Sequence, residues 1–248
     1  MNDQTDRKSR LLRLKVWGDN ACFTRPELKV ERVSYDVMTP SAARGIVESV
    51  LWKPAIRWHI VQIDVLKPIR CGSVRGNEGT INEPAQYLTR WESVRRNEVG
   101  CVMSSRTNGI FVEEQRQQRA GLFLRDVAYT IHAYFELTDK AGAEDTVIKF
   151  QEMFLRRAEK GQSFHRPYLG CREFAAYFEL VSNDQSLPEP IPVSRELGYM
   201  LHDVYHDNSA DRDNRHFCNE RCSPHFFLAV LENGCLKVPP FDSAEVRA

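Results

Sequence analysis

The segment DVAYTIHAYFEL, residues 126–137, has the clearest secondary-structure pattern in the chain, and the rest of the fold can be read outward from it. Its apolar side chains fall on alternate positions: Val127, Tyr129, Ile131, Ala133, Phe135 and Leu137. Most of the positions between them are polar. Because successive side chains of a strand point to opposite sides of a sheet, this alternation predicts a half-buried β-strand.

Two strands and a helix are predicted before this segment. Residues 11–17 and 56–65 show the same alternation, and a one-residue slip at Val61 predicts a bulge in the second of them. Between them, Thr39 and the proline after it form a typical helix start, and apolar residues recur at helical spacing until Pro54.

A second helix and a fourth strand are predicted after it. Asp145 can cap a helix that ends near Gly161, where a glycine suits the left-handed conformation after a last turn. Residues 174–180 alternate again and predict a strand. The order is βαββαβ, so we predict an α+β, ferredoxin-like (RRM-like) domain with two helices on one face of an antiparallel sheet. The other face is then available for binding.

Two regions do not belong to this core. Residues 71–122 form an arginine-rich insertion that is too long for a plain connection in a compact domain. The proline-rich run 186–194 separates residues 10–185, the predicted ferredoxin-like domain with its insertion, from a small C-terminal β part at 186–248. In that part, Asn233-Gly234 is the strongest short hairpin signal in the chain.

Charge and cysteine content limit the function classes. The chain has 34 Lys+Arg against 34 Asp+Glu, so there is no overall excess of positive charge for nucleic acid, and such a role must come from charge distribution. The seven cysteines are odd in number and follow no secretory leader, which favours reduced thiols in a cytoplasm. No run of 18 apolar residues predicts a membrane span.

The insertion and its flanks contain arginine but no lysine. Between Pro68 and Asp139 there are nine arginines, among them Arg116, Arg119 and Arg125. The planar guanidinium binds phosphate in a fork and stacks on bases, so this bias suits RNA. Ordinary surface ion pairs with the glutamates of the same region explain the composition equally well.

Common catalytic motifs are absent, and one metal-site candidate is weak. There is no P-loop, GxGxxG or HExxH motif, and we expect no cofactor. His216, Cys218, Cys222 and His225 could bind zinc locally, but they lack paired CxxC knuckles. His202 and His206 would add ligands if they shared a helical face. A polar loop is the favoured interpretation, and a zinc-stabilised adaptor is the third hypothesis for the chain.

The remaining candidates for a functional site are basic and aromatic residues around the predicted sheet. They are Lys29, Arg32, Tyr35, Arg44, Lys149, His165, Arg166 and Arg172. Such a mixture holds single-stranded RNA, because arginines follow phosphates and rings stack on splayed bases. RNA also carries its own nucleophile, the 2′-OH, so cleavage needs a base, an acid and a cation rather than a metal. A helix-end histidine and a solvated lysine are the simpler interpretations of His165 and Lys149.

The chain resembles the type I-C Cas-five family of CRISPR-associated proteins (d/c subtype) over nearly its whole length. The segments that carry the resemblance are 21–54, 67–70, 116–131, 155–174, 196–201 and 226–234. The resemblance implies an RRM-like domain with a small C-terminal β-sheet part. It also implies metal-independent cleavage of precursor CRISPR RNA at the base of the repeat hairpin. The protein would then stay on the 5′ handle as a Cascade subunit, beside the backbone and large subunits.

The resemblance also implies a catalytic set of a tyrosine from the first helix, a lysine and an adjacent histidine. The lysine corresponds to Lys149, but Leu51 and Phe150 occupy the other two positions. His165 and Tyr35 are chemically able to replace them. We therefore predict Lys149, His165 and Tyr35 as catalytic residues. The predicted RNA contacts are Lys29, Arg32, Arg44, Arg116, Arg119, Arg125, Arg166 and Arg172.

Two hypotheses follow for RNA. In the first, the chain cleaves the repeat by 2′-OH attack. In the second, it binds the 5′ handle without cutting, as a structural subunit, and another nuclease acts. Nonspecific DNA contact is a further expectation for such a surface, and no membrane partner is expected.

Overall fold

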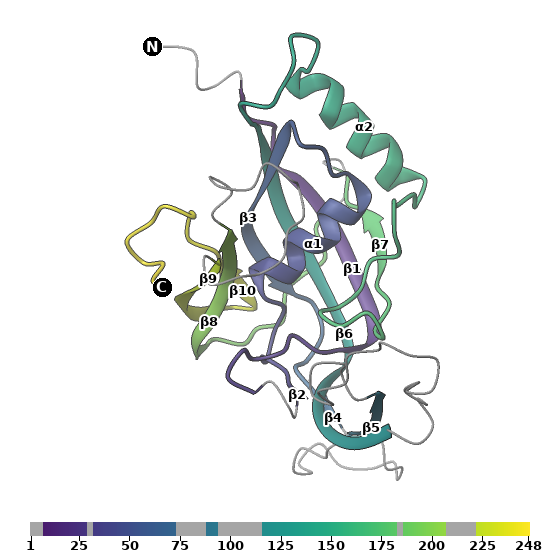
Figure 1. The fold of residues 1–248 in the computed structure, drawn as a ribbon, viewed down its shortest axis with the longest axis vertical. Helices are drawn as coiled ribbons and strands as arrows, with labels where there is room; N and C mark the ends of the chain where they lie inside the picture. Colours follow the sequence, from purple (N-terminus) through teal and green to yellow (C-terminus); the bar gives the residue numbers. More distant parts are fainter. Residues whose placement is uncertain (1–6, 29–31, 73–87, 94–115, 183–185, 207–221) are drawn as a thin grey trace, which may run out of the picture.

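The computed structural model describes residues 7–28, 32–72, 88–93, 116–182, 186–206 and 222–248. Of residues 72, 88–93, 116–120, 206 and 222 it describes the backbone only. The fold is mixed α/β, with a mostly antiparallel sheet whose strand order is β7-β1-β6-β3-β10-β9-β8. Helices α1 and α2 both cover the same face of this sheet (Figure 1). The core lies between that face and the helices.

The central strands match the alternation in the sequence closely. They are β1 (Leu12–Ala21), β3 (Ile56–Val65) and β6 (Arg116–Leu137). β6 pairs antiparallel with β1 and with β3, and the register shifts between Ile60 and Gln62. The predicted bulge at Val61 is therefore confirmed. β6 begins earlier than the predicted strand, because its first half pairs with strands outside the core.

The first helix, α1, spans Pro40–Val50. The Thr39 side chain accepts a hydrogen bond from the Ala42 backbone N–H at 3.3 Å, which satisfies one of the free donors of the first turn. Ala43, Ile46, Val47 and Val50 are buried against the sheet. The predicted start of the helix is thus confirmed, and the helix ends at Val50, before Pro54.

The second helix, α2, spans Val147–Glu159, and its N-cap is Thr146 rather than Asp145. The Thr146 hydroxyl accepts from the Lys149 backbone N–H, whereas the Asp145 carboxylate accepts from Gly142 N–H one turn earlier. Gly161 has φ 62°, as a left-handed residue after a helix requires. Strand β7 (Tyr177–Leu180) then pairs with β1, and it starts three residues later than the alternation predicts.

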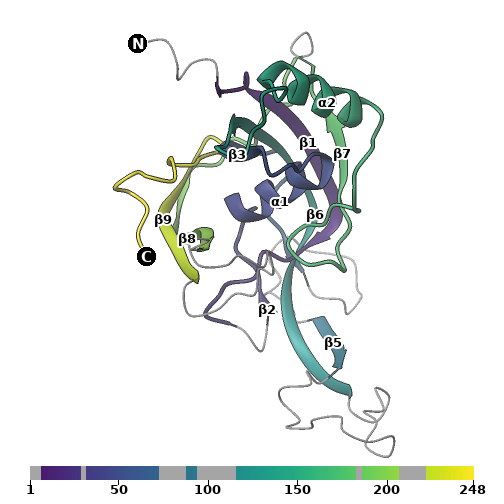
Figure 2. The ribbon, with the colours of Figure 1, turned by 45° about the horizontal axis from the view of Figure 1, so that its top comes forward.

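The insertion contributes strands to one end of β6. β4 (Cys71–Gly72) and β5 (Leu88–Ser93) pair antiparallel with it, and β2 (Arg32–Val33) pairs parallel. β5 and the first residues of β6 form a ribbon that extends away from the body of the molecule (Figure 2). Asp126, with φ 50°, lies between the ribbon half and the core half of β6.

The C-terminal strands extend the sheet beyond β3. They are β8 (Arg195–His206), β9 (Cys222–Glu232) and β10 (Cys235–Lys237), and β10 pairs with β3. The predicted hairpin at Asn233-Gly234 is confirmed, and both residues have positive φ. The helical face on which His202 and His206 could have added zinc ligands does not form, because both residues lie in β8. Within the described ranges, no helix has the length and apolar character that a membrane span requires.

Candidate functional site

The predicted catalytic residues Lys149 and His165 lie at opposite ends of α2. Lys149 is in the first turn, and His165 follows the last turn and Gly161. A helix rises 1.5 Å per residue, so the 13 residues of α2 separate its ends by about 20 Å. The two side chains therefore do not converge on one scissile phosphate within the folded chain.

The Lys149 ammonium is exposed and held near the start of its own helix. Its Nζ lies 3.1 Å from Asp145 Oδ1 and 3.4 Å from the Glu144 carbonyl oxygen. The Gly142 N–H and the Lys149 ammonium together hold the pKa of Asp145 below its ordinary value. Lys149 thus faces solvent as one half of an ion pair.

His165 lies in an exposed loop that connects α2 to β7. Phe164 N donates to the Ser49 carbonyl at 2.7 Å, which anchors the loop to the last turn of α1. The His165 ring contacts the rings of Phe164 and Tyr168, with centroids 6.2 and 6.4 Å away. Phe164 itself is 90% exposed. The loop, residues 161–174, therefore presents an imidazole and an aromatic ring to solvent.

Two arginines lie within the same loop, and a third contacts it. Arg166 and Arg172 are exposed and form no ion pair with any described residue. Arg32 reaches the loop from β2: its Nη1 donates to Cys171 Sγ at 3.3 Å and lies 3.5 Å from Glu173 Oε1. Three of the predicted RNA contacts thus lie on or against the loop that contains His165, and we define loop 161–174 with Arg32 as the candidate site.

Tyr35 is a buried residue of the same neighbourhood. It is 2% exposed, and its hydroxyl accepts a hydrogen bond from Leu201 N at 3.3 Å. The Arg25 guanidinium lies over its ring, 4.5 Å from the centroid. Burial raises the pKa of the Tyr35 hydroxyl. No described contact joins Tyr35 to Lys149 or His165, so the structure gives it a packing role between the first segments of the chain and β8.

Leu51 and Phe150, the positions where the resemblance expects a tyrosine and a histidine, both lie in the core. Leu51 is fully buried, and its carbonyl accepts from Trp58 Nε1 at 2.8 Å. Phe150 packs edge-on against Phe135. Neither position presents a side chain to solvent in this chain.

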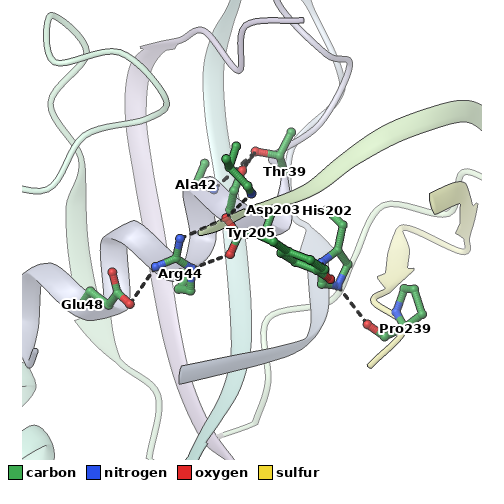
Figure 3. Close-up of polar contacts among 10 residues, drawn as sticks. Thr39, Ala42, Arg44, Glu48, His202, Asp203, Tyr205 and Pro239 are labelled. Atoms are coloured by element: carbon green, nitrogen blue, oxygen red, sulfur yellow. Dashed lines mark hydrogen bonds and ion pairs between the residues drawn. The ribbon is translucent and has the colours of Figure 1, made fainter. Parts of the chain in front are cut away.

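Arg44 is engaged in ion pairs rather than free for RNA. Its Nε and Nη2 form a fork with the two Asp203 carboxylate oxygens at 2.6 and 3.0 Å, and its Nη1 lies 2.8 Å from Glu48 Oε1 (Figure 3). The fork ties α1 to β8. A phosphate at Arg44 would have to displace two carboxylates.

The other predicted contacts are placed in part. Arg125 is exposed on β6, beside the strand β4. Arg116 and Arg119 lie in the ribbon half of β6, opposite Ser93 and Arg90, and their side chains are outside the described part of the chain. Lys29 also lies outside the described residues.

The zinc candidate receives no support from the residues that can be placed. His216 and Cys218 lie outside the described residues, and of Cys222 only the backbone is described. His225 stacks on the Tyr205 ring with centroids 3.7 Å apart. Among the residues that the structure describes, no three histidine, cysteine or acidic side chains gather as metal ligands do.

Two features of the loop were missed by sequence reasoning. Cys171 and Cys22, far apart in the chain, share Thr24 as a hydrogen-bond partner. Arg166 lies over the ring of Tyr177, 6.0 Å from its centroid, and Tyr177 is 52% exposed on β7. The first feature depends on long-range packing. The second had a signal, an aromatic residue on the outward face of a predicted edge strand.

Comparisons with known proteins agree on one family. A family model described as CRISPR-associated protein (Cas_Cas5) matches residues 11–239. A protein of Mannheimia succiniciproducens named CRISPR pre-crRNA endoribonuclease Cas5d is 45% identical over 252 residues, covering 95% of this chain and 98% of its own. A protein of Thermus thermophilus with the same name is 40% identical, covering 92% and 91%.

Solved structures share the fold. One, titled as a CRISPR-associated protein, superposes with a TM-score of 0.65 at 20% identity and covers 98% of this chain and 99% of its own. Another is a functionally uncharacterized protein from Streptococcus mutans, with a TM-score of 0.63 at 20% identity and coverage of 97% and 98%. The similarity extends over the C-terminal strands as well as the core.

Proposed function

Because the chain belongs to the Cas5 family of CRISPR-associated proteins, in its Cas5d branch, we propose that it is a pre-crRNA endoribonuclease. The observation that carries this proposal is the 40–45% identity, over more than nine tenths of the chain, to two proteins of that name. The two matches cover 98% and 91% of the relatives' own lengths.

The proposed reaction is attack of a ribose 2′-OH on the adjacent phosphorus at the base of the CRISPR repeat hairpin. The O–P bond to the 2′-oxygen forms, and the bond to the 5′-oxygen of the next nucleotide breaks. The 2′-OH proton goes to a base, and the leaving 5′-oxygen receives a proton from an acid. The products are a 2′,3′-cyclic phosphate and a 5′-OH, with no metal-bound step.

His165 is the group that we assign to proton transfer. It is exposed, and its ring contacts are with Phe164 and Tyr168. Arg166 follows it directly and forms no ion pair with any described residue. Arg166 and Arg172 supply positive charge for the phosphate. Lys149 lies about one helix length away, so we assign it to a second phosphate of the same RNA. We assign Tyr35 a packing role between Arg25 and β8, away from the proton transfers.

The fold and partners are inferred in the same way. The order β7-β1-β6-β3 with both helices on one face supports a ferredoxin-like core within residues 10–185. Residues 186–248 form a smaller part joined to that core by the pairing of β10 with β3. We infer that the protein stays on the 5′ handle as a Cascade subunit beside the backbone and large subunits, in the cytoplasm.

A cleavage assay in EDTA with a labelled repeat hairpin tests this proposal. Wild type should cut at one bond and leave a 2′,3′-cyclic phosphate, and His165→Ala should slow the single-turnover rate about 10²- to 10⁴-fold. Lys149→Ala should mainly weaken RNA binding. His225→Ala, which removes an imidazole from strand β9 rather than from the loop, is the matched control. Undiminished cutting by His165→Ala contradicts the assignment, and a slow Tyr35→Phe would give that hydroxyl a chemical role.

A non-cleaving subunit is the second candidate, and one observation favours it. Leu51 and Phe150 are buried apolar residues where the family pattern has a tyrosine and a histidine. In that case the protein binds repeat RNA tightly and in a salt-sensitive manner, but the RNA remains intact. The same assay separates the two candidates, because it reads binding and cutting on one substrate.

A further inference from the structure

The helix-free face of the sheet ends in a pair of stacked rings at its β7 edge. Trp17 on β1 and Tyr177 on β7 are direct cross-strand partners. Their rings are 6.1 Å apart between centroids, with 24° between the planes. β7 is the last strand in the order, so none of the strands that the structure describes covers this edge. Of the pair, Tyr177 is the more open to solvent.

Cations surround these rings. Lys15 Nζ lies 5.3 Å from the Trp17 centroid, and Arg166 Cζ lies 6.0 Å from that of Tyr177. Arg13 lies on the same outward face of β1 as Lys15 and Trp17, because side chains two residues apart point the same way. The Lys15 ammonium is 3.9 Å from Glu179, at the limit of an ion pair. The rings therefore lie within a basic surface.

The guanidinium of Arg13 contains a buried hydrogen-bond donor that lacks an acceptor among the described residues. Its Nε is buried and has no hydrogen-bond partner, and the guanidinium forms no ion pair with any residue that the structure describes. A buried donor left without a partner is energetically unfavourable, because it has lost its hydrogen bonds to water. An anion bound at this end of β1 would satisfy it. Phosphate suits the planar fork of arginine particularly well.

The centre of the same face is closed, which limits where a ligand can bind. Thr130 is fully buried, and His132 and Asp64 form a buried pair at 2.7 Å. Toward β3, the proline-rich run is held by hydrogen bonds from Ile191 N to Val65 O and from Gly234 N to Val193 O. The accessible part of the face is therefore its β1–β7 edge.

We propose that the pair Trp17–Tyr177, the edge platform, stacks a base of single-stranded RNA while Arg13 and Arg166 bind the flanking phosphates. This inference rests on the proposed function, since it names where the RNA strand next to the cleavage loop is held. Exposed rings within a cationic surface are the arrangement that binds splayed bases. Arg166 joins the platform to His165, its neighbour in the chain, so a base on Tyr177 brings its own backbone to the loop.

Photocrosslinking and affinity measurements on a single-stranded RNA of about 12 nucleotides test the platform. With 5-iodouridine placed along the RNA, irradiation should give an adduct on the peptide of Trp17 or Tyr177. Tyr177→Ala should weaken binding about 5- to 100-fold, whereas Tyr177→Phe retains the ring and should bind nearly as wild type. Arg13→Gln should lower the slope of log affinity against log salt by about 1.

Tyr199 provides the matched control. It is 58% exposed on β8, away from β7 in the strand order, so Tyr199→Ala should leave the affinity unchanged. Equal affinity of Tyr177→Ala and wild type, with no adduct on either ring, overturns the platform even if hairpin cleavage is intact. An adduct on the platform without any hairpin cleavage supports the platform and removes the proposed nuclease function instead. An edge platform used for protein contact would show neither the adduct nor the loss of RNA affinity.

Discussion

The thiol of Cys171 lies in surroundings that favour its charged form. Its pKa is lowered first by the hydrogen bond with Cys22, and Thr24 and the nearby Arg32 guanidinium act in the same direction. Arg32 Nη1 donates to Cys171 Sγ at 3.3 Å. The pKa of the partner thiol, Cys22, is raised, first by its hydrogen bond with Cys171 and then by burial. These contacts join the candidate loop to the end of β1 and favour the thiolate form of Cys171.

We expect this thiolate to be visible in solution. Thiolate absorbance at 240 nm should begin to rise at a lower pH than the ordinary titration of the other cysteines, because the folded protein stabilises the charged sulfur of Cys171. Cys171→Ser should remove this first step and leave the later ones. Cys235→Ser is the control, since burial raises the pKa of Cys235. An unchanged titration curve in Cys171→Ser would contradict the expectation.

At the scale of elements, two glycines differ in whether the backbone around them could accept a side chain. Gly234 has φ 77°, and a Cβ added there would lie 2.3 Å from the Ile191 carbonyl oxygen. Gly45 is an exposed helical residue of α1 around which a Cβ would meet nothing within 4 Å. The first glycine allows the β9–β10 turn to pack under the proline-rich run. The second has no such function in the fold.

The two glycines should therefore respond oppositely to alanine. Gly45→Ala should raise the free energy of unfolding by about 0.5–1 kcal/mol, because alanine loses less backbone entropy in a helix. Gly234→Ala should lower it by about 1–3 kcal/mol or more through left-handed strain and the clash. Urea denaturation of the two variants beside wild type measures both, and a shift of the same sign in both would contradict the argument.

The tie between α1 and β8 gives a second prediction at this scale. Arg44→Ala leaves the carboxylates of Asp203 and Glu48 without their shared partner, so we expect a loss of about 1–2 kcal/mol in unfolding free energy. That figure is at the low end for charged hydrogen bonds because the Arg44 side chain still reaches solvent. Arg172→Ala, an exposed arginine outside any ion pair of the described chain, should unfold as wild type does. Equal stability of the two variants would show that the fork does not stabilise the fold.

Elements whose periodicity is unbroken, or broken only once as in β3, could be predicted from the sequence, whereas a strand whose periodicity is broken twice could not. β1, α1, β3 and the core half of β6 follow simple patterns. β8 was missed because its register shifts twice, between Glu196 and Gly198 and between Leu201 and Asp203, which breaks the alternation. The cap of α2 was misplaced by one residue because Asp145 and Thr146 are both good caps.

The candidate site could be predicted only in part, for a related reason. That His165 follows a helix could be seen in the sequence, and the length of α2 already implied that Lys149 lies far from it. The engagement of Arg44 by Asp203, and the burial of Tyr35 against Leu201, join residues more than 150 positions apart. Local patterns contain no information on such contacts.

At the scale of the whole molecule, buried titratable groups set how stability changes with pH. Burial lowers the pKa of His202, whose ring Nε2 lies 3.0 Å from the Pro239 carbonyl oxygen. Burial alone would raise the pKa of Asp64, but hydrogen bonds from His132 and Gln62 outweigh it, and the net pKa is lowered. His202 joins β8 to the C-terminal segment at Pro239, and Asp64 joins β3 to β6 through His132.

We expect stability to fall on acidification in two steps. His202 is kept neutral by the fold, so below its ordinary pKa of 6.5 the unfolded chain binds a proton that the folded chain does not, and stability decreases. The stability from Asp64 is present above its ordinary pKa of 3.8 and is lost as pH falls through the lower folded value. Urea midpoints at about pH 7.5 and about pH 5.5 should differ for wild type and differ less for His202→Gln. A His202→Gln variant with the full pH dependence would remove His202 as the cause.

Strand β6 has a consequence for how this protein can change in evolution. Its 22 residues pair with β1 and β3 at one end and with β5 at the other, so a single stretch of backbone sets the register of both the core and the ribbon. An insertion or deletion of one residue within it would turn every side chain on one side of the change to the opposite face. We therefore expect length differences among relatives to fall outside residues 116–137, so that the ribbon can vary in reach while its base stays fixed.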